Sequence, residues 1–343
     1  MDIAALGRQL GVRYLLEGNV RRVGTSLRVT TQLMEAATGE VMWTGKFDRL
    51  LAELAELQEE LVTDIAASLD SQVYIQEMER ALKKPSDITA WEAVARSMAA
   101  YRDWGAGSHK LAIEEAARAV AIAPDYAPGL AAYAAALADR YLATSGDDPA
   151  EVQRIRSLAE RALALDPDNA QVLCWAGEAL CFTGSPEDGE RHTARAVRKA
   201  PGSGFLHLIH SVACMLLNRP EQALQHADSA ERLMPGSHFM WAVKLAQARP
   251  LVVLERWVEA RAAAVEALLI DPTNVEGHVL QTLCHLLLGQ EADARKCIFA
   301  LRGLETDLDQ FEHRLRILLP FENLSEDDIV TVRTLWSQVD AGR

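Results

Sequence analysis

The sequence has little cysteine and a deficit of positive charge, and each shortage excludes a class of protein. Only five of the 343 residues are cysteines and no two form a C-x-x-C pair: Cys174, Cys181, Cys214, Cys284 and Cys297. An odd number without paired spacing indicates a reduced protein rather than a disulfide framework. The formal net charge is −14, which argues against non-specific binding to nucleic acid or to an anionic membrane, because both need a basic surface.

Long apolar runs and catalytic motifs are also missing. No stretch reaches the roughly 20 apolar residues that a spanning helix needs, and residues 1 to 16 interrupt their apolar positions with Asp2, Arg8 and Arg13, unlike a secretory signal. No H-E-x-x-H, no G-x-S-x-G and no plausible pair of catalytic carboxylates is present. We therefore expect a cytoplasmic protein that is not an enzyme, needs no cofactor and inserts in no membrane.

What is present is a repeat. Pro167, Pro201 and Pro235 are 34 residues apart, and Pro124 and Pro272 extend the series with gaps of 43 and 37. Small residues recur in the second half of each unit: Ala159 and Ala162, Thr193 and Ala196, Ala227 and Ala230, Ala264 and Ala267. A period of this length, with one amphipathic helix pair per unit, predicts a stacked helical solenoid.

The repeat resembles the tetratricopeptide family. The unit from 170 to 203 matches that pattern at Leu173, Ala176, Gly177, Leu180, Gly189, Ala196 and Pro201. The next unit, 204 to 237, matches it at His207, His210, Ser211, Cys214, Ala223, Ala230 and Pro235. The resemblance implies about five to six helix pairs between residues 88 and 306, a concave groove lined by the first helix of each pair, and a protein or peptide partner.

Individual helices can also be placed. We expect the first one over residues 88–104, with Ser86 or Asp87 as its N-cap, and its partner over residues 111–122. Pro250 is expected to break or kink the helix that contains it. Helices over residues 309–318 and 325–338 should cap the stack, within a capping region from 307 to 343.

The first 75 residues have a different pattern. Residues 3–10 repeat apolar positions as a helix does, residues 12–23, 27–36 and 41–47 are predicted to be strands joined by turns, and residues 51–83 return to the helical period. The fold class is thus mainly α, a helical solenoid preceded by a small, incomplete α/β domain of helix, three antiparallel strands and helix, with residues 76–87 as a helical linker.

This opening resembles the second half of the TolB-like amino-terminal domain, through the run from Leu10 to Arg22, Leu27 to Leu33, Ala37-Thr38-Gly39 and Trp43. The end from Leu319-Pro320-Phe321 onward is similar to the same family. In bacteria that domain precedes tetratricopeptide repeats in proteins headed by a class III adenylate or guanylate cyclase domain, or by a winged-helix domain.

The resemblance implies that the family's first strand, helix and strand would precede residue 3, so we expect this chain to start after them. None of the cyclase's metal-binding aspartates can be placed on it, and an enzyme name would describe an absent neighbouring domain. A sheet without its first strands leaves an unpaired edge, so residues 12–47 are a possible surface for homo-oligomers.

The expected function is protein interaction, as a scaffold of a signalling protein or as the accessory region of a cyclase. The candidate groove residues are Cys174, Glu178, Phe182, Phe205, Leu208, Val212, Met215, Val279 and Leu283. Most are apolar, which favours an apolar helix or extended segment as partner over a carboxylate-ended peptide. The alternative is that the capping helices already fill the groove.

One group of residues imitates a metal site. His207, His210 and Cys214 share a helix face, and such side chains bind zinc. Because four ligands are normally needed and the sequence suggests no fourth, we interpret the three as packing residues and predict no metal.

Overall fold

The computed structural model describes residues 2–50, 65, 88–103, 108–143, 148–304, 308, 309, 312 and 326–341. The chain divides into two compact units, Met1–Glu79 and Arg80–Arg343, which we take separately. In the described residues no helix is both long and apolar enough to cross a bilayer.

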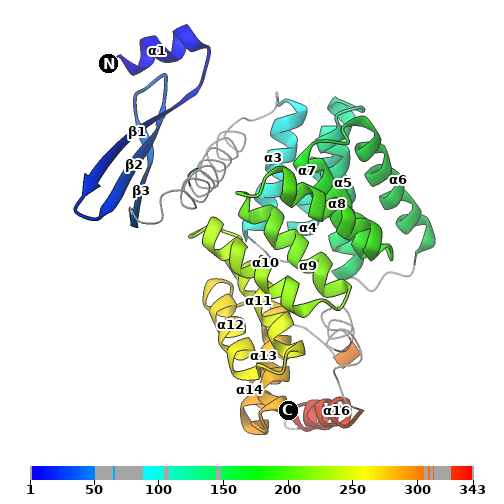
Figure 1. The fold of residues 1–343 in the computed structure, drawn as a ribbon. Coiled ribbons are helices and arrows are strands. Elements are labelled where there is room, and N and C mark those ends of the chain that lie inside the picture. The colour runs from blue at the N-terminus through cyan, green and yellow to red at the C-terminus, as the bar shows by residue number, and fades with distance from the viewer. Residues whose placement is uncertain are drawn as a thin grey trace. The chain divides into compact units, whose positions relative to one another are not determined.

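The first unit contains a helix and a three-stranded antiparallel sheet (Figure 1). Its elements are α1 Ile3–Leu10, β1 Tyr14–Val23, β2 Ser26–Glu35 and β3 Val41–Leu50, with strand order β1-β2-β3. Tyr14 lies opposite Glu35 and Val23 lies opposite Ser26. The predicted helix and three strands are confirmed, whereas the predicted helix over 51–83 lies outside the described residues except at position 65.

The central strand forms the interior of this unit. Val29, Leu33 and Met34 of β2 are at most 7% exposed. On β1, by contrast, every residue from 16 to 23 is exposed, and Val20 reaches 63%. β1 is therefore an edge strand of the described sheet, paired on one side only.

The second unit is a stack of helix pairs (Figure 1). Its first helices are α3 Ala90–Ala99, continued by the 3-10 turn Ala100–Asp103, then α5 Ala127–Ala143, α7 Ala170–Phe182, α9 Gly204–Leu216, α11 Met240–Val253 and α13 Val275–Leu287. Their second helices are α4 Ser108–Ile122, α6 Pro149–Leu165, α8 Pro186–Lys199, α10 Pro220–Leu233, α12 Trp257–Ile270 and α14 Glu291–Gly303. Each second helix packs on its own first helix and, where another pair follows, on the first helix of that pair.

Small residues set how closely the helices approach. The alanines and the threonine that recur in the sequence at 159, 162, 193, 196, 227, 230, 264 and 267 are all 0% exposed. Between α7 and α8, a Cβ built on Gly177 would lie 2.8 Å from the carbonyl oxygen of Gly189. Two helix backbones can come this close only where the side chains between them are small. The two helices of each pair therefore require the glycines and alanines of the repeat.

Two predicted details, the N-cap of the first helix and the break at Pro250, were wrong. The N-cap of α3 is Thr89, whose hydroxyl accepts from the Glu92 N–H while the Glu92 carboxylate accepts from the Thr89 N–H. This reciprocal capping box satisfies two donors at once and prevails over a single cap further upstream. The break predicted at Pro250 does not occur, because α11 runs on to Val253, and the kink stays a prediction. Pro250 lies in the last turn, where the Leu254 N–H still donates to the Pro250 carbonyl.

The last described helix covers the end of the stack. It is α16 Glu326–Ala341, close to the predicted 325–338, and it packs on α13 and α14. Leu335, Trp336 and Val339 join the same buried cluster as Val279 and Leu283. The other predicted cap, 309–318, lies almost wholly outside the described residues.

Substituting Gly189 by alanine should destabilise the stack. The added methyl would overlap the carbonyl oxygen of Gly177 and the sulfur of Cys181, and such overpacking typically costs about 1–3 kcal/mol. The measurement is the denaturant midpoint of unfolding. Gly303→Ala is the matched control, because a methyl there meets nothing and alanine favours a helix. Equal midpoints for the two variants would contradict this account of the pairing.

Candidate functional site

The first helices of the pairs form a continuous face. Successive first helices pack on one another from α3 through α13, and in the described residues no contact of similar extent links successive second helices. The first helices therefore lie on the inner side of the stack, which is the side that repeat proteins of this kind use for binding.

The nine groove candidates divide into two groups. Glu178 and Phe182 of α7 and Phe205 and Val212 of α9 are half-buried and reach the surface. The other five are at most 4% exposed: Cys174, Leu208, Met215, Val279 and Leu283. These five side chains are core residues, so only the first four remain candidates for contact with a partner.

Neighbouring helices account for the burial of the five. Leu208 packs with Ala227 and Ala230 of α10 and with Val243 of α11. Met215 packs with Cys214, Ala223 and Val253. In the last pair, Val279 and Leu283 share a cluster with residues of α16. Burial beside α16 at these two positions is what the alternative of a groove filled by the capping helices would lead one to expect.

Phe205 has an aromatic neighbour from the next repeat. Its ring centroid lies 5.3 Å from that of Phe239, at an interplanar angle of 51°. Both rings are half-buried and pack against the cluster around Leu208. The two rings thus continue the accessible apolar surface from α9 toward the start of α11.

Two carboxyl groups interrupt the apolar face at α5 and α7. Burial raises the pKa of Asp139 to about 6, and a hydrogen bond from Tyr101 partly opposes the rise. Burial, and then the charge of Asp139, raise the pKa of Glu178 well above its usual range. Neither takes part in an ion pair with the described residues. The raised pKa values favour the neutral form of both carboxyl groups.

A shallow cleft of about 490 Å³ lies at the amino ends of α3, α5 and α7. Trp91, Tyr126 and Gln171 are among its lining residues. Its carboxylates already have partners, since Asp125 pairs with Arg161 at 2.6 Å and Asp166 accepts from Asn169 at 3.0 Å. The cleft extends the inner face but adds no free charged group.

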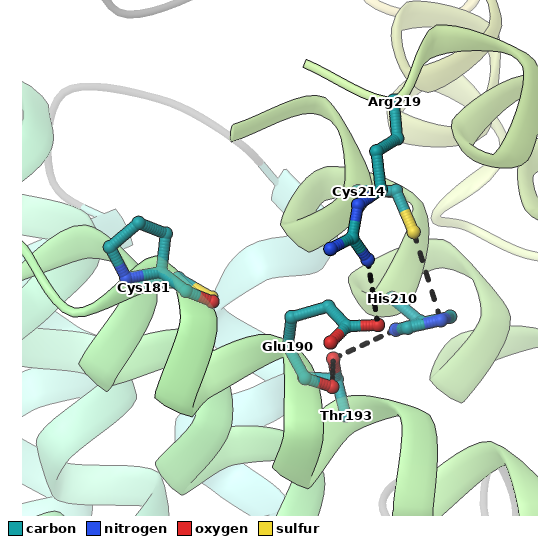
Figure 2. Close-up of polar contacts among 7 residues, drawn as sticks. Cys181, Glu190, Thr193, His210, Cys214 and Arg219 are labelled. Carbon is teal, nitrogen blue, oxygen red and sulfur yellow. Dashed lines mark hydrogen bonds and ion pairs between the residues drawn. The ribbon is translucent and has the colours of Figure 1, made fainter. Parts of the chain in front are cut away.

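A hydrogen-bond network joins α8 to α9 (Figure 2). The Thr193 hydroxyl donates to the Glu190 carbonyl at 3.1 Å, and the Nδ1 of His210 lies 2.9 Å from the same hydroxyl oxygen. The imidazole must then donate from Nδ1, which leaves Nε2 as an acceptor facing the Cys214 sulfur at 3.7 Å. The neutral form of His210 satisfies all these contacts.

A second network joins α9 to α10. Nε2 of His207 lies 3.0 Å from the carbonyl oxygen of Pro201, which can only accept. Nδ1 of His207 lies 2.9 Å from Nδ1 of His226. In the neutral His207 this Nδ1 carries no proton and can only accept, so Nδ1 of His226 donates the hydrogen bond. His226 also packs edge-on against His210, with 4.5 Å between ring centroids.

The surroundings keep these imidazoles neutral. Burial, and then the neighbouring imidazoles and the guanidinium groups of Arg198 and Arg219, lower the pKa of His210 to about 3. Burial and His207 lower the pKa of His226 to about 4. Glu190, the one carboxylate of the network, is already 3.5 Å from Arg219 (Figure 2). Protonation of either imidazole would therefore create a positive charge with no unpaired carboxylate in the network to balance it.

The contacts of His207, His210 and Cys214 are hydrogen bonds to neighbouring residues of the stack. Within the described residues no group of three or more histidine, cysteine, aspartate or glutamate side chains has a geometry that could hold a metal ion. Burial also raises the pKa of the Cys214 thiol to about 11.

Sequence reasoning missed His226, which bridges the other two histidines. Aligning the repeats could have found it, because His192 and His226 stand 34 residues apart, at the same repeat position.

The histidine network makes stability depend on pH. A lowered pKa means that the unfolded chain binds more protons, so this stability is complete above the ordinary pKa of about 6.5 and is lost as the pH falls toward 4. When the pH falls from 7 to 5, we expect each of His210 and His226 to lower the free energy of unfolding by about 1 kcal/mol, after allowance for solvent screening. The measurement compares unfolding midpoints of the wild type with those of the double variant His210→Asn, His226→Asn.

The same comparison separates opposing titrations. The raised pKa of Asp139 acts in the opposite direction, because protonation below pH 6 favours the folded form, but it is present in both proteins. The double variant should therefore lose less stability than the wild type on acidification. An identical pH dependence in both would show that the histidines do not titrate with folding.

Comparison with known proteins adds one relative by sequence. No family model matches the chain. A protein of Rhizobium meliloti (strain 1021) named "Putative adenylate cyclase 3" is 31% identical over 176 residues, which are 50% of this chain and 29% of the relative. The chain thus spans less than a third of that relative's length.

Solved structures also resemble part of this chain. The Cut9-Hcn1 hetero-tetramer of the APC/C has a TM-score of 0.52 at 13% identity, covering 74% of this chain and 47% of that one. TTC0263, a TPR protein of Thermus thermophilus, has a TM-score of 0.45 at 20% identity, covering 55% of this chain and 98% of that one. YrrB, described as a TPR protein with an unusual peptide-binding site, has a TM-score of 0.39 at 16% identity, covering 60% of this chain and 99% of that one. The fold is a tetratricopeptide-type helical solenoid preceded by a small unit with three antiparallel strands.

Proposed function

We propose that this chain is a non-catalytic interaction module that binds an apolar helix or extended segment on the inner face of α7 and α9. The observation that carries this proposal is the accessibility of Phe182, Phe205 and Val212 on successive first helices. Half-buried apolar side chains on the inner side of a solenoid can be covered further by a partner, which would stabilise the complex by burying apolar area.

The charges of the inner face narrow the class of partner. Asp139 and Glu178 lie on the inner helices α5 and α7 without an ion pair from the described residues. The raised pKa values favour the neutral carboxyl forms, so a peptide's terminal carboxylate would find no cation to pair with there, whereas a neutral apolar segment needs none. The partner is therefore a protein segment recognised by its apolar side chains.

The biological setting is a bacterial signalling or regulatory protein of the cytoplasm, with no nucleic acid or membrane among its direct ligands. The partial relative that is named as a cyclase and the TolB-like pattern of residues 1 to 75 support this setting. The division into 1–75, 76–87, 88–306 and 307–343 belongs to the same proposal. So does self-association through the sheet edge of residues 12–47.

A substitution on the inner face should abolish partner capture. Val212→Asp places a charge where an apolar contact is proposed, on the same helix as Phe205. Val258→Asp makes the same chemical change on α12, where the side chain is 59% exposed on the outer side. The experiment compares proteins captured from a bacterial lysate by wild type and both variants, quantified by mass spectrometry.

We expect a set of proteins that the wild type and Val258→Asp retain and that Val212→Asp loses by at least about tenfold, since a buried unpaired charge costs more than about 1.4 kcal/mol. Circular dichroism checks that both variants are folded. Retention of the same proteins by Val212→Asp would remove the inner face of α9 as the binding surface.

The alternative is that the chain is the accessory region of an adenylate or guanylate cyclase whose catalytic domain is not in this chain. Both proposals make the same prediction for the isolated chain. Incubated with ATP or GTP and Mg²⁺ or Mn²⁺, the purified chain should form no cyclic nucleotide, because no described residues form a metal-binding cluster. Turnover above that of a buffer blank would refute the non-catalytic proposal.

A further inference from the structure

β1 is a long edge strand, and among the described residues no strand pairs with its outer side. It spans ten residues, Tyr14–Val23, and residues 16 to 23 are all exposed, with Leu16 and Val23 each at 48%. The strand contains no proline that would block pairing. Edges of this length with apolar side chains are templates for another strand.

The turn determines which backbone groups of β1 point outward. Val23 pairs with Ser26 across the two-residue loop Gly24-Thr25, and Gly24 has φ of 61°, as the first loop residue of a type II′ turn does. In such a hairpin the residues that flank the loop exchange both hydrogen bonds, and hydrogen-bonded pairs then alternate along the strands. The residues with N–H and C=O on the free edge are therefore Leu16, Gly18, Val20 and Arg22.

Two opposite charges lie on this strand without ionic partners. Glu17 and Arg21 are exposed and form no ion pair with the described residues. They are four residues apart, so they lie on the same face of the sheet and at equal distances from Asn19.

We propose that the edge is occupied by β1 of a second copy of this chain, antiparallel, about a two-fold axis at Asn19. This inference deepens the self-association proposed above by naming its strand and register. Each residue of one copy then lies opposite the residue of the second copy that is the same number of positions from Asn19 in the opposite direction along the strand. Glu17 of each copy therefore lies opposite Arg21 of the other. The interface contains two symmetric cross-strand ion pairs.

The remaining pairs fit the same register. Leu15 lies opposite Val23, which places two apolar side chains together at each end. On the other face Val20 lies opposite Gly18, where no side chain competes for space, and diagonal to Leu16 of the second copy, within reach of an apolar contact. All four outward-pointing residues find hydrogen-bonding partners, because Gly18 pairs with Val20 and Leu16 pairs with Arg22.

Neighbouring registers lack these matches. Moving the axis to Gly18 puts Glu17 opposite Asn19, and moving it to Val20 puts Glu17 opposite Val23. An axis at Arg21 or at Glu17 sets like charges directly opposite each other, which is destabilising. Charge complementarity thus selects the axis at Asn19 among the two-fold pairings of this strand.

The test is a charge exchange in the full chain. Sedimentation equilibrium should show a dimer for the wild type, at least about tenfold weaker dimers for Glu17→Arg and for Arg21→Glu, and recovery in the double variant Glu17→Arg, Arg21→Glu. Each single change replaces two attractive pairs by two repulsive ones, and the double change restores both. Arg8→Glu, an exposed charge reversal on α1, is the matched control and should dimerise as the wild type does.

A single cysteine tests the register independently of charge. Asn19→Cys faces its own copy across a non-hydrogen-bonded pair, where Cα atoms are about 4.5 Å apart, within the range for a disulfide. Under mild oxidation it should cross-link, while Thr25→Cys in the loop should not. The five natural cysteines are buried and serve as the uncrosslinked background.

The outcomes separate this inference from the proposals on which it rests. A wild-type chain that stays monomeric at high micromolar concentration would overturn both self-association and the register. A dimer unaffected by both single charge reversals, or without an Asn19→Cys cross-link, would overturn the register alone. Neither result bears on partner capture by α7 and α9.

Discussion

The close approach of two helices within each pair is the constraint on which the second unit depends. A helix pair can bury its apolar stripes only if its backbones meet where side chains are small, and Gly177 and Gly189 show this limit, since a Cβ on either would overlap the other's carbonyl oxygen. The fully buried alanines of the second helices repeat the condition. Once pairs have formed, each exposes a face that only the next pair can cover, so the stack follows from the pairing.

The same packing decides which polar groups are allowed inside. His210 is accepted between α8 and α9 because both ring nitrogens of its neutral form have partners, the Thr193 hydroxyl and the Cys214 thiol. The neutral His226 on α10 hydrogen-bonds to His207. The carboxyl groups of Asp139 and Glu178 are accepted with raised pKa values, without compensating cations among the described residues. Neutrality rather than ion pairing is how this stack tolerates titratable groups in its interior.

How far the sequence predicted the structure depended on whether the signal was local or tertiary. The 34-residue period and the alanines predicted the helix pairs, and alternation predicted the strands up to their turns. Thr89 was missed as a cap because its capping box with Glu92 was not recognised. Leu208 and Met215 were assigned to the groove from repeat position alone, yet they are buried. Position fixes the direction of a side chain, but how far the neighbouring α10 and α11 cover it depends on their own side chains.

The helix at the end of the stack has a consequence for assembly. Any solenoid ends in a face identical in kind to the faces inside it, so an uncovered last pair would accept the first pair of another molecule and grow into a filament. α16 places Leu335, Trp336 and Val339 on that terminal face and merges them with the cluster around Leu283. A segment of the chain itself therefore occupies the surface through which stacking in that direction would proceed.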